Sequence, residues 1–514
     1  MLISNSNSNH YWQRAPHGLP QGMRERHGQT MRNLDLKFGT SGLRGLAIDL
    51  AGRPAFTYSL AFARLLLGRG LVGPKGKILI GRDLRASSPE IAEACAAGIA
   101  AAGLAPVDCG ALPTPALACF GLAEKHPAIM VTGSHIPGDR NGLKFYRPDG
   151  EIDKTDEKEI VALEAAISED LTWNPRVGPE IERGALECYM ARLLDFFPAR
   201  SLAGTRVGVY QHSSVARDLL VSLLGELGAE TIALGRSETF VAVDTEALRQ
   251  EDQKAVLDWA RDFRLSAIVS ADGDADRPLI ADGEGRFLRG DLVGAATAHA
   301  LGADCVVTPI TSNSGLELSG KFKRVLRTRI GSPYVIEGIQ QAIADGAKCV
   351  VGFEANGGVL LGTAVELDGR KLSALPTRDA LLPVLCLLVS ANSSGQPLEI
   401  LGKEFSFRAA AGDRLDRVPS EISSAFLARL SQDRDFRRDL LGPRYAGPGI
   451  DRLDGVRMTG SDGSIVHFRA SGNAPELRCY VEEMTEPDAK ALLELALRKT
   501  RSILDGQGYD RSRS

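Results

Sequence analysis

The segment KILIGRDLRASSPEIAEACAAGIAAAGLAPVDC, from Lys77 to Cys109, has the pattern of one strand–helix–strand unit. It opens with a short apolar run of the kind found in buried strands. Ser88 and Pro89 are residue types that favour the N-cap and the first turn of a helix, and apolar residues then recur at helical spacing. Gly103 ends the helix, and the last residues return to a strand pattern. The segment therefore predicts an α/β unit with parallel strands.

The same order of elements recurs twice further along the chain. Residues 206–234 and 305–327 each have the pattern of strand, helix and strand, with a helix expected near 314–322 in the later copy. Such alternation predicts α/β domains with largely parallel strand pairing.

Residues 399–514 have a different pattern, in which a strand expected at 405–410 is followed by helices and closely spaced strands without regular alternation. This pattern predicts a smaller α+β domain. A chain of 514 residues is also too long for one ordinary domain. We divide it into an N-terminal tail expected to be disordered (1–33), three α/β domains (34–170, 185–285 and 286–398) and the C-terminal domain (399–514).

Composition and charge are those of an ordinary globular chain. Hydrophobic residues make up 44% and charged residues 25%, and the net charge of −4 shows no basic excess that would indicate a nucleic-acid partner. No apolar run reaches the roughly 18 residues of a membrane span, and the first residues lack the apolar core of a secretory signal. The eight cysteines form no CxxC pair, which favours reduced thiols over structural zinc. We therefore expect a cytoplasmic protein, monomeric or dimeric, without nucleic-acid or membrane partners.

Two loops that follow apolar strands carry reactive or metal-ligating residue types. The first, TGSHIPGDRNGLKFY from Thr132 to Tyr146, presents Ser134 beside a glycine, and its hydroxyl is expected to be unobstructed. The second, DGDADR from Asp272 to Arg277, contains three alternate carboxylates, which repel one another unless a cation lies among them. The three are those of Asp272, Asp274 and Asp276. Hard oxygen ligands suit Mg²⁺, and an EF-hand loop is excluded because its required glycine and glutamate are missing.

Two further loops add a carboxylate and a group of hydrogen-bond donors. GFEANGG, from Gly352 to Gly358, carries Glu354 among glycines that let a ligand approach the backbone. RASGNAPE, at 469–476, gathers donors that suit a phosphate group. These donors are Arg469, Ser471, the Gly472 amide and Asn473. Each loop taken singly also fits a simple polar turn, but ligands bind at the carboxyl ends of strands in open α/β sheets, so all four loops are expected to line one cleft.

These four loops, in this order, resemble those of the α-D-phosphohexomutase family, which includes phosphoglucomutases and phosphomannomutases. The segment KFGTSGLRG, from Lys37 to Gly45, is similar to the N-terminal signature of that family, and the resemblance extends over about 34–505. It implies an α/β fold of four domains around a central cleft, with three repeated α/β domains that have mixed sheets and a smaller C-terminal α+β domain. It also implies Mg²⁺ as the cofactor and a hexose 1,6-bisphosphate as activator and intermediate.

The resemblance also implies roles for the matching positions. Ser134 matches the serine that carries a phosphoryl group, and this group binds Mg²⁺ together with the three aspartates. Lys144 matches a lysine that transfers protons, and His135 and Arg44 complete the expected catalytic set. The residues expected to contact the sugar are Arg277, Glu354, Asn356, Arg329 and Gly331. Those expected to hold the phosphate that is not being transferred are Arg469, Ser471, Gly472 and Asn473.

Three loops depart from the family pattern. The serine loop has Gly133 and Ile136 where alanine and asparagine are common. The sugar loop has Asn356 where serine is usual and Gly358 where some members have histidine. The phosphate loop has Asn-Ala where Thr-Glu is common. The second departure bears on the choice of sugar, because that loop contacts the sugar hydroxyls.

The resemblance favours a phosphomannomutase that interconverts mannose 1-phosphate and mannose 6-phosphate through a phosphoserine and a hexose 1,6-bisphosphate. A phosphoglucomutase, or an enzyme with both activities, is the alternative, because the two sugars differ only at C2. A phosphoglucosamine mutase is less favoured, since its serine loop resembles SASHNP. Two other classes remain to be tested: a non-catalytic relative that binds a sugar phosphate would have lost Ser134 or an aspartate, and a metal-dependent phosphatase would release inorganic phosphate.

Overall fold

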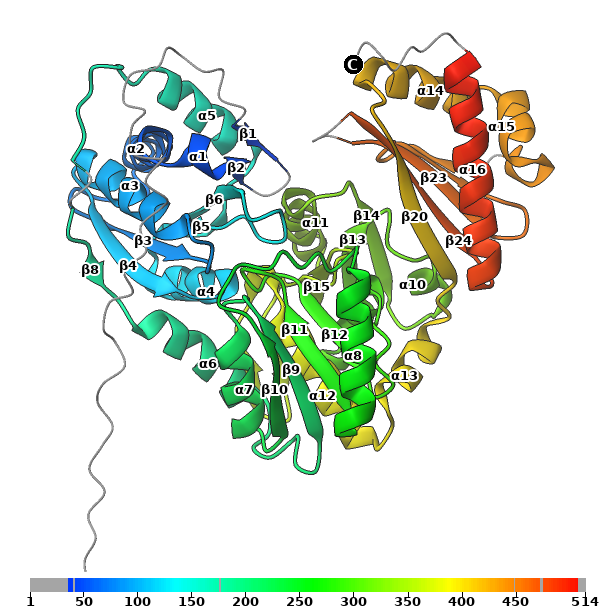
Figure 1. The fold of residues 1–514 in the computed structure, drawn as a ribbon, viewed down its shortest axis with the longest axis horizontal. Coiled ribbons are helices and arrows are strands. Elements are labelled where there is room, and N and C mark those ends of the chain that lie inside the picture. Colours follow the sequence, from blue (N-terminus) through cyan, green and yellow to red (C-terminus); the bar gives the residue numbers. More distant parts are fainter. Residues whose placement is uncertain (1–35, 40–41, 175–176, 448, 472–474, 507–514) are drawn as a thin grey trace, which may run out of the picture. The chain divides into compact units, whose positions relative to one another are not determined.

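A computed structural model describes residues 36–39, 42–174, 177–447, 449–471 and 475–506 (Figure 1). The tail expected at 1–33 lies outside these residues. Within the described residues, the strands form four sheets and one separate two-stranded hairpin.

The first sheet contains the segment with which the sequence analysis began. β3 (Lys77–Arg82) is parallel to β4 (Ala105–Ala111) and to β5 (Ala128–Val131), and β5 pairs antiparallel with β6 (Arg140–Arg147). The remaining strands are β1 (Lys37–Phe38), β2 (Leu43–Leu46), β7 (Gly150–Glu151) and β8 (Glu180–Ile181). The helices are α1 (Ala47–Leu50), α2 (Arg53–Gly68), α3 (Ser88–Ala101), α4 (Thr114–Glu124) and α5 (Lys154–Ala165). The N-cap of α3 is Ser87, so the expectation that Ser88 caps this helix is wrong; the Ser88 hydroxyl instead donates to Asp83.

The second sheet has the order β10-β9-β11-β12. β9 (Arg206–His212) is parallel to β10 (Glu230–Arg236) and to β11 (Ala267–Ala271), whereas β12 (Pro278–Asp282) is antiparallel to β11. The DGDADR segment is therefore the turn between two paired strands. The helices of this second region are α6 (Gly184–Phe196), α7 (Arg217–Glu226) and α8 (Gln250–Phe263).

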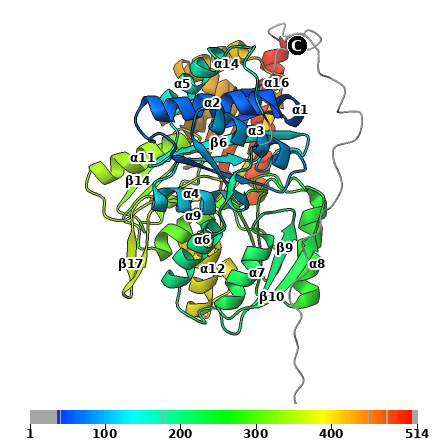
Figure 2. The same ribbon diagram turned by 90° about the vertical axis from the view of Figure 1, so that its left-hand side faces the viewer.

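The third sheet has the order β14-β13-β15-β16-β19, and the hairpin of β17 and β18 extends away from it (Figure 2). Its strands are β13 (Cys305–Pro309), β14 (Arg324–Thr328), β15 (Val350–Phe353), β16 (Val359–Leu361) and β19 (Leu375–Asp379), and the hairpin consists of β17 (Val365–Leu367) and β18 (Arg370–Leu372). Its helices are α9 (Gly290–Ala300), α10 (Gly315–Leu318), α11 (Ser332–Ala344) and α12 (Leu381–Ser394). The helix expected near 314–322 is thus only the single turn of α10.

The fourth sheet is antiparallel, with the order β20-β24-β23-β22-β21. Its strands are β20 (Ala409–Asp416), β21 (Ile450–Asp451), β22 (Val456–Thr459), β23 (Ile465–Ala470) and β24 (Glu476–Glu483). Helical segments are α13 (Leu398–Leu401), η2 (Gly402–Phe405), α14 (Ser420–Gln432), α15 (Arg434–Leu441), η3 (Pro443–Tyr445) and α16 (Glu486–Gly506). The strand expected at 405–410 is wrong, because Ser406 has a φ of 53° and extended backbone begins only at Ala409.

The apolar cores follow this division into sheets. The largest core is continuous through α4, α6, α7, α9 and α12, so it joins helices of the first three sheets. The fourth sheet and its helices enclose a core of their own, which includes Phe426, Leu430, Phe468 and Leu492. The mixed sheets of three α/β regions and the smaller C-terminal α+β region confirm the predicted fold class. Among the described helices none is alone both long and apolar enough to cross a membrane, although the bent pair Leu381–Ser394 and Leu398–Phe405 meets those criteria jointly.

Candidate active site

Ser134 lies in the loop between β5 and β6, directly after a fully buried strand. Its backbone N–H donates to Thr132 Oγ1 at 2.8 Å, and Thr132 in turn donates to Asp83 Oδ2 at 2.8 Å. Ser134 has a φ of 53°, a left-handed conformation that costs a non-glycine residue on the order of 1 kcal/mol. The surrounding hydrogen bonds therefore hold the serine in a backbone conformation that it would otherwise seldom adopt.

Arg85, which follows β3, holds the same loop through its side chain. The guanidinium is completely buried, pairs with Asp83 Oδ2 at 3.1 Å, and lies 4.0 Å from the centre of the Phe240 ring. It also donates to four loop carbonyl oxygens at 2.6–3.0 Å, those of Ser134, Ile136, Pro137 and Arg140. A Cβ atom at Gly133 would lie 2.5 Å from Arg85 Cζ, so glycine at this position makes room for the guanidinium.

The Ser134 side chain is covered in this structure. It is completely buried, and its hydroxyl donates to Asp272 Oδ2 at 2.5 Å and lies 3.2 Å from His135 Nδ1. The expectation of an unobstructed hydroxyl is therefore wrong for this conformation. The cause is the DGDADR turn, which packs against the serine loop so closely that a Cβ at Gly273 would lie 2.8 Å from the Ser134 carbonyl oxygen.

The three aspartates of this turn form a compact buried cluster. One ligand oxygen from each of Asp272, Asp274 and Asp276 can be chosen so that all lie within 4.8 Å of one another. Thr114 Oγ1 and Lys144 Nζ both donate to Asp274 Oδ2 at 2.6 Å. Lys144 also donates to Asp276 Oδ2 at 2.5 Å.

The other oxygens of two aspartates fit a divalent cation. Oδ1 of Asp274 and Oδ1 of Asp276 are buried and accept no hydrogen bond from the part of the chain that the structure describes. Buried carboxylate oxygens without partners are costly, and Mg²⁺ prefers such oxygen ligands. With the Ser134 hydroxyl already bonded to Asp272, these residues can together hold a cation beside the serine.

The charges of this cluster are strongly coupled. Burial, reinforced by the charges of Asp274 and Asp276, raises the pKa of Asp272 well above its usual range. Burial acts on Asp276 in the same sense, but Arg378 and Lys144 offset it and hold the pKa of Asp276 far below its usual range. Burial opposes the charge on Lys144, yet Asp274 and Asp276 raise its pKa above the ordinary value. Lys144 is therefore a protonated ammonium group at neutral pH.

His135 differs from Lys144 in its charge. Burial lowers the pKa of His135 far below its ordinary value, and the positive charges of Arg277 and Arg44 lower it further. The imidazole is therefore neutral at pH 7. Burial and the same kind of repulsion, from Arg277 and Arg378, lower the pKa of Arg44 to about 10, so Arg44 remains charged.

A cavity of about 480 Å³ opens beside this cluster. Arg44 of β2, His135 of the serine loop and Arg277 of the metal loop line it, and so do Glu354 and Asn356 of the sugar loop. Nε and Nη1 of Arg277 are buried and donate no hydrogen bond to the described part of the chain. Their nearest carboxylate oxygens, Oδ1 of Asp276 and Oε2 of Glu246, lie 3.8 and 3.9 Å away, beyond hydrogen-bond distance. The size of the cavity and the N–H groups of Arg277 suit a phosphorylated sugar.

The segment 328–331 contributes in a different way from that expected. Ile330 lines the cavity and its N–H donates to Asp454 Oδ2 at 3.0 Å. The exposed side chain of Arg329 instead lies over the Tyr334 ring at 5.7 Å, and Gly331 is the N-cap of α11. The cavity lining includes neither Arg329 nor Gly331 in this structure.

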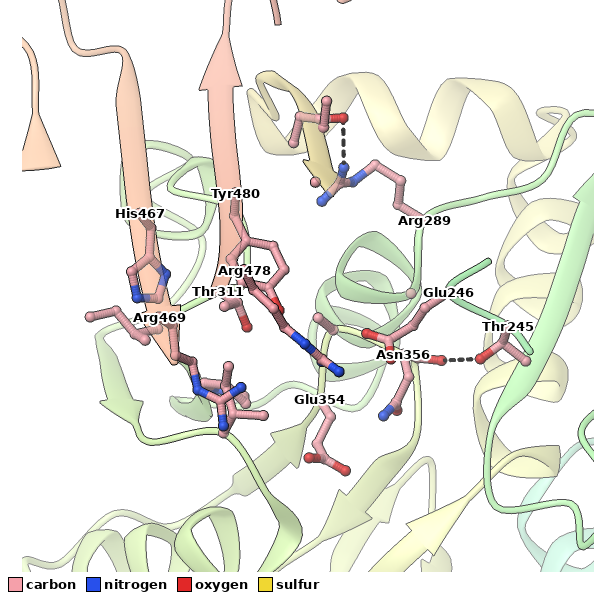
Figure 3. A pocket seen from close by; sticks show the side chains of 18 of the residues that line it. Thr245, Glu246, Arg289, Thr311, Glu354, Asn356, His467, Arg469, Arg478 and Tyr480 are labelled. Atoms are coloured by element: carbon pink, nitrogen blue, oxygen red, sulfur yellow. Dashed lines mark hydrogen bonds between the residues drawn. The ribbon is translucent and has the colours of Figure 1, made fainter. Parts of the chain in front are cut away.

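The fourth sheet forms the opposite end of the cavity. Arg469 on β23 pairs with Asp454 at 3.0 Å, and both Arg469 and Ser471 line the cavity. Figure 3 shows Arg478 of β24 extending toward Asn356 and Glu354. Gly472 and Asn473, which were expected in the same loop, lie outside the described residues.

The sequence analysis missed several residues that this geometry brings into the site. They include Arg85, Thr114, Arg289, Arg378 and Arg478. The signal for Arg85 was present, because its polar segment follows an apolar strand just as the four chosen loops do. Arg378 carried a weaker signal, a polar triplet within an otherwise apolar strand–helix segment.

The comparisons with known proteins agree with this architecture. Models of the phosphoglucomutase/phosphomannomutase alpha/beta/alpha domains I, II and III match residues 35–170, 187–285 and 289–406, respectively. The chain belongs to the α-D-phosphohexomutase family. It is accordingly an enzyme of the isomerase class, which moves a phosphoryl group within a sugar phosphate.

Two of the most similar relatives are phosphomannomutases. A phosphomannomutase of Sinorhizobium fredii is 48% identical over 457 residues, covering 88% of this chain and 96% of the relative. One from Salmonella muenchen is 41% identical over 470 residues, covering 91% and 96%, respectively. The crystal structure of a phosphoglucomutase/phosphomannomutase family protein from Burkholderia thailandensis has the same fold, with a TM-score of 0.70 and 18% identity over 90% of this chain and 97% of that one.

Proposed function

We propose that this enzyme is a phosphomannomutase that interconverts mannose 1-phosphate and mannose 6-phosphate, with Ser134 as the phosphoryl carrier. The observation that carries the proposal is the 2.5 Å hydrogen bond from Ser134 Oγ to the first of three buried, clustered aspartates. A phosphoryl group on this serine would lie beside a cation site, which is the arrangement that phosphoryl transfer requires. The relatives named phosphomannomutase support the choice of sugar.

Mg²⁺ fits the site as the cofactor. Asp272, Asp274 and Asp276 would hold it, together with an oxygen of the phosphorylated Ser134. When bound, it supplies positive charge that neutralises the phosphoryl group during transfer.

Two side chains lie where the protons must move. As the phosphorus–oxygen bond to Ser134 breaks and one to the sugar hydroxyl forms, that hydroxyl loses a proton and the serine oxygen gains one. His135 lines the cavity and lies 3.2 Å from the serine hydroxyl through its Nδ1. Lys144 donates to Asp274 beside the serine, and we propose that these two residues carry the protons. The return of a phosphoryl group to Ser134 reverses both proton movements.

The two ends of the cavity suit the two phosphates of a hexose 1,6-bisphosphate. Arg44 and Arg277 surround the serine end, while Arg469 and Ser471 belong to the other end. We propose that the bisphosphate intermediate turns round, so that each phosphate occupies each end once. Glu354 would accept hydrogen bonds from the sugar hydroxyls and, with Asn356, contact the sugar, while Gly472 and Asn473 would complete the binding of the second phosphate. Arg329 and Gly331 were expected to contact the sugar too, but the cavity lining includes neither of them. We also propose a cytoplasmic location, because all eight cysteines are free thiols, which is usual in a reducing compartment.

A coupled assay of the purified chain tests the function. Mannose 1-phosphate and glucose 1-phosphate are each supplied with Mg²⁺ and a trace of hexose 1,6-bisphosphate, and formation of the 6-phosphate is followed. We expect turnover of both substrates to depend on the bisphosphate, with the higher kcat/KM for mannose 1-phosphate. A preference for glucose 1-phosphate would make the enzyme a phosphoglucomutase, and release of inorganic phosphate instead of a 6-phosphate would contradict the mutase mechanism.

A further inference from the structure

Arg378 joins the metal loop to the sugar loop. It lies on β19, and only 4% of its side chain is exposed. Its Nη2 donates to Asp276 Oδ2 at 2.5 Å, and its Nη1 donates to Glu354 Oε2 at 2.7 Å. A single planar guanidinium therefore binds one carboxylate expected to hold the cation and another expected to contact the sugar.

The Arg378 side chain has room to reach the metal loop because residue 358 is a glycine. A Cβ atom at Gly358 would lie 2.8 Å from Arg378 Cδ and 2.8 Å from the backbone carbonyl oxygen of Asp276. In this chain, the absence of a side chain at residue 358 lets Arg378 cross from β19 to the metal loop.

The hydrogen bonds of Arg378 also orient Asp276. Oδ2 of Asp276 accepts from both Arg378 and Lys144, while Oδ1 accepts no hydrogen bond within the described structure. Oδ1 lies 3.8 Å from Arg277 Nε, beyond hydrogen-bond distance, and is thus the Asp276 oxygen available to a cation. Residues that hold metal ligands in this way typically contribute about 10–100-fold to metal affinity or activity.

We propose that Arg378 is a positioning residue that couples cation binding at the metal loop to sugar-phosphate binding at the sugar loop. The proposal rests on the function proposed above for the two loops. A cation that orders Asp276 also orders Arg378, and through it Glu354, so the sugar phosphate meets a carboxylate already in place. Linkage requires the reverse effect to be equally large: a bound sugar phosphate tightens cation binding by the same factor.

Arginine is suited to this task in a way that lysine is not. The guanidinium presents different N–H groups to two carboxylates in fixed directions, whereas an ammonium is a single flexible point charge. Arg378→Lys therefore keeps the positive charge but loses the rigid connection. Because the charge is unchanged, direct attraction between the cation and a sugar phosphate is similar in both proteins, so a difference in coupling measures the connection itself.

Arg192→Lys is a matched control. Arg192 is also buried, donates to the Ser373 carbonyl oxygen, and lies 3.6 Å from the carboxylate of Asp379, the residue next to Arg378. It is not among the residues that line the cavity. A general effect of replacing a buried arginine should therefore appear in both variants, whereas an effect on coupling should appear only in Arg378→Lys.

The test measures binding with the dephosphorylated full chain. Mn²⁺ serves as the probe and its binding is followed by electron paramagnetic resonance, with and without mannose 6-phosphate. We expect mannose 6-phosphate to tighten Mn²⁺ binding at least about 5-fold in the unsubstituted protein, and Mn²⁺ to tighten mannose 6-phosphate binding equally in calorimetry. In Arg378→Lys, Mn²⁺ binding should weaken about tenfold and the coupling factor should fall toward one, while Arg192→Lys keeps both values.

Three results would overturn the inference: no coupling in the unsubstituted protein, unchanged coupling in Arg378→Lys, or an equal loss in Arg192→Lys. If Arg378→Lys does not fold, Glu354→Gln breaks the same connection from the sugar end and should also remove the coupling; unchanged coupling there would contradict the inference. Failure of the proposed function is distinguishable, because it appears as absent turnover of both hexose 1-phosphates, whereas the Mn²⁺ affinities still decide whether Arg378 positions Asp276.

Discussion

The side chains at the two ends of the cavity differ in how deeply they are buried and in how many partners hold them. At the serine end, Ser134 and Asp274 are completely buried, and each is held by partners from more than one element. At the phosphate end, 11% of the Arg469 side chain and 37% of the Arg478 side chain are exposed. Each of these arginines pairs with one nearby carboxylate, that of Asp454 or Glu476.

This difference corresponds to two different tasks. In the proposed mechanism, bonds to phosphorus change at the serine end, where charges and donors must be fixed in advance of the reaction. The phosphate end would have only to hold a phosphate and then release it so that the intermediate can turn, and its sheet has a core of its own. We therefore expect changes at the serine end to lower kcat and changes at the phosphate end to raise KM.

The largest effect is expected at the cation site. Asp274→Ala removes a ligand from the three-carboxylate cluster and should lower Mg²⁺-dependent kcat by about 10³-fold or more, because a metal ion contributes several kcal/mol to stabilising the transition state. Circular dichroism should show a folded protein. Unchanged turnover in the folded variant would remove Asp274 from the cation site.

A smaller but still large effect is expected from Arg85→Lys, which loses the guanidinium contacts that hold the serine loop. Misplacing the reacting oxygen should lower kcat about 10²-fold, with little change in KM. Arg82→Lys is the control, because Arg82 is the last residue of β3, three residues before Arg85, but pairs with Asp108. Gly133→Ala should reproduce the loss by displacing the guanidinium; normal kcat in both Arg85→Lys and Gly133→Ala would show that the loop needs no such support.

At the phosphate end, Arg469→Lys should act mainly on binding. It loses the paired N–H donors with which a guanidinium binds two oxygens of a phosphate. KM for the hexose phosphate should therefore rise about tenfold, with kcat changed by less than about threefold. Steady-state kinetics separate the two constants. Arg452→Lys, which alters a guanidinium that contacts Ser431, should change neither. A drop in kcat as large as that of Arg85→Lys would contradict the division of tasks between the two ends.

The smallest expected effect concerns stability. Burial lowers the pKa of His467 to about 4 from an ordinary 6.5, so the folded state binds this proton less readily than the unfolded chain. The stabilising contribution is present above pH 6.5 and is lost as the pH falls toward 4. Between pH 7 and pH 5.5, the free energy of unfolding should fall by about 1 kcal/mol through this residue. In urea unfolding, the free energy of His467→Gln should fall by about 1 kcal/mol less over this pH range than that of the unsubstituted protein. An identical pH dependence in the two proteins would contradict the role given to His467.

Much of the fold could be predicted from the sequence, because many of its elements are specified by short local patterns. The strand–helix–strand unit beginning at Lys77 occurs as expected, since its apolar spacing and its terminal glycine describe one local unit. The exceptions have local causes that no pattern revealed. Ser406 adopts a left-handed conformation, and the helix expected near 314–322 is a single turn.

The candidate site was accessible only in part. The pattern of polar loops after apolar strands predicted that Ser134 and the three aspartates lie together, as the structure has them, because such positions share one edge of the sheets. Arg378 was missed because its role depends on contacts with Asp276 and Glu354, which lie 102 and 24 residues away in sequence. The burial of the Ser134 hydroxyl was missed for the same reason, since it results from packing between two separate domains.

The most direct test of the central claim is to locate the phosphoryl group. The chain is incubated with Mg²⁺ and a radiolabelled hexose 1,6-bisphosphate, digested, and its peptides are examined by mass spectrometry. We predict one phosphoryl group on the peptide that contains Ser134, its transfer to sugar when mannose 1-phosphate is added, and neither labelling nor turnover in Ser134→Ala. Label on another residue, or full turnover by Ser134→Ala, would contradict the account.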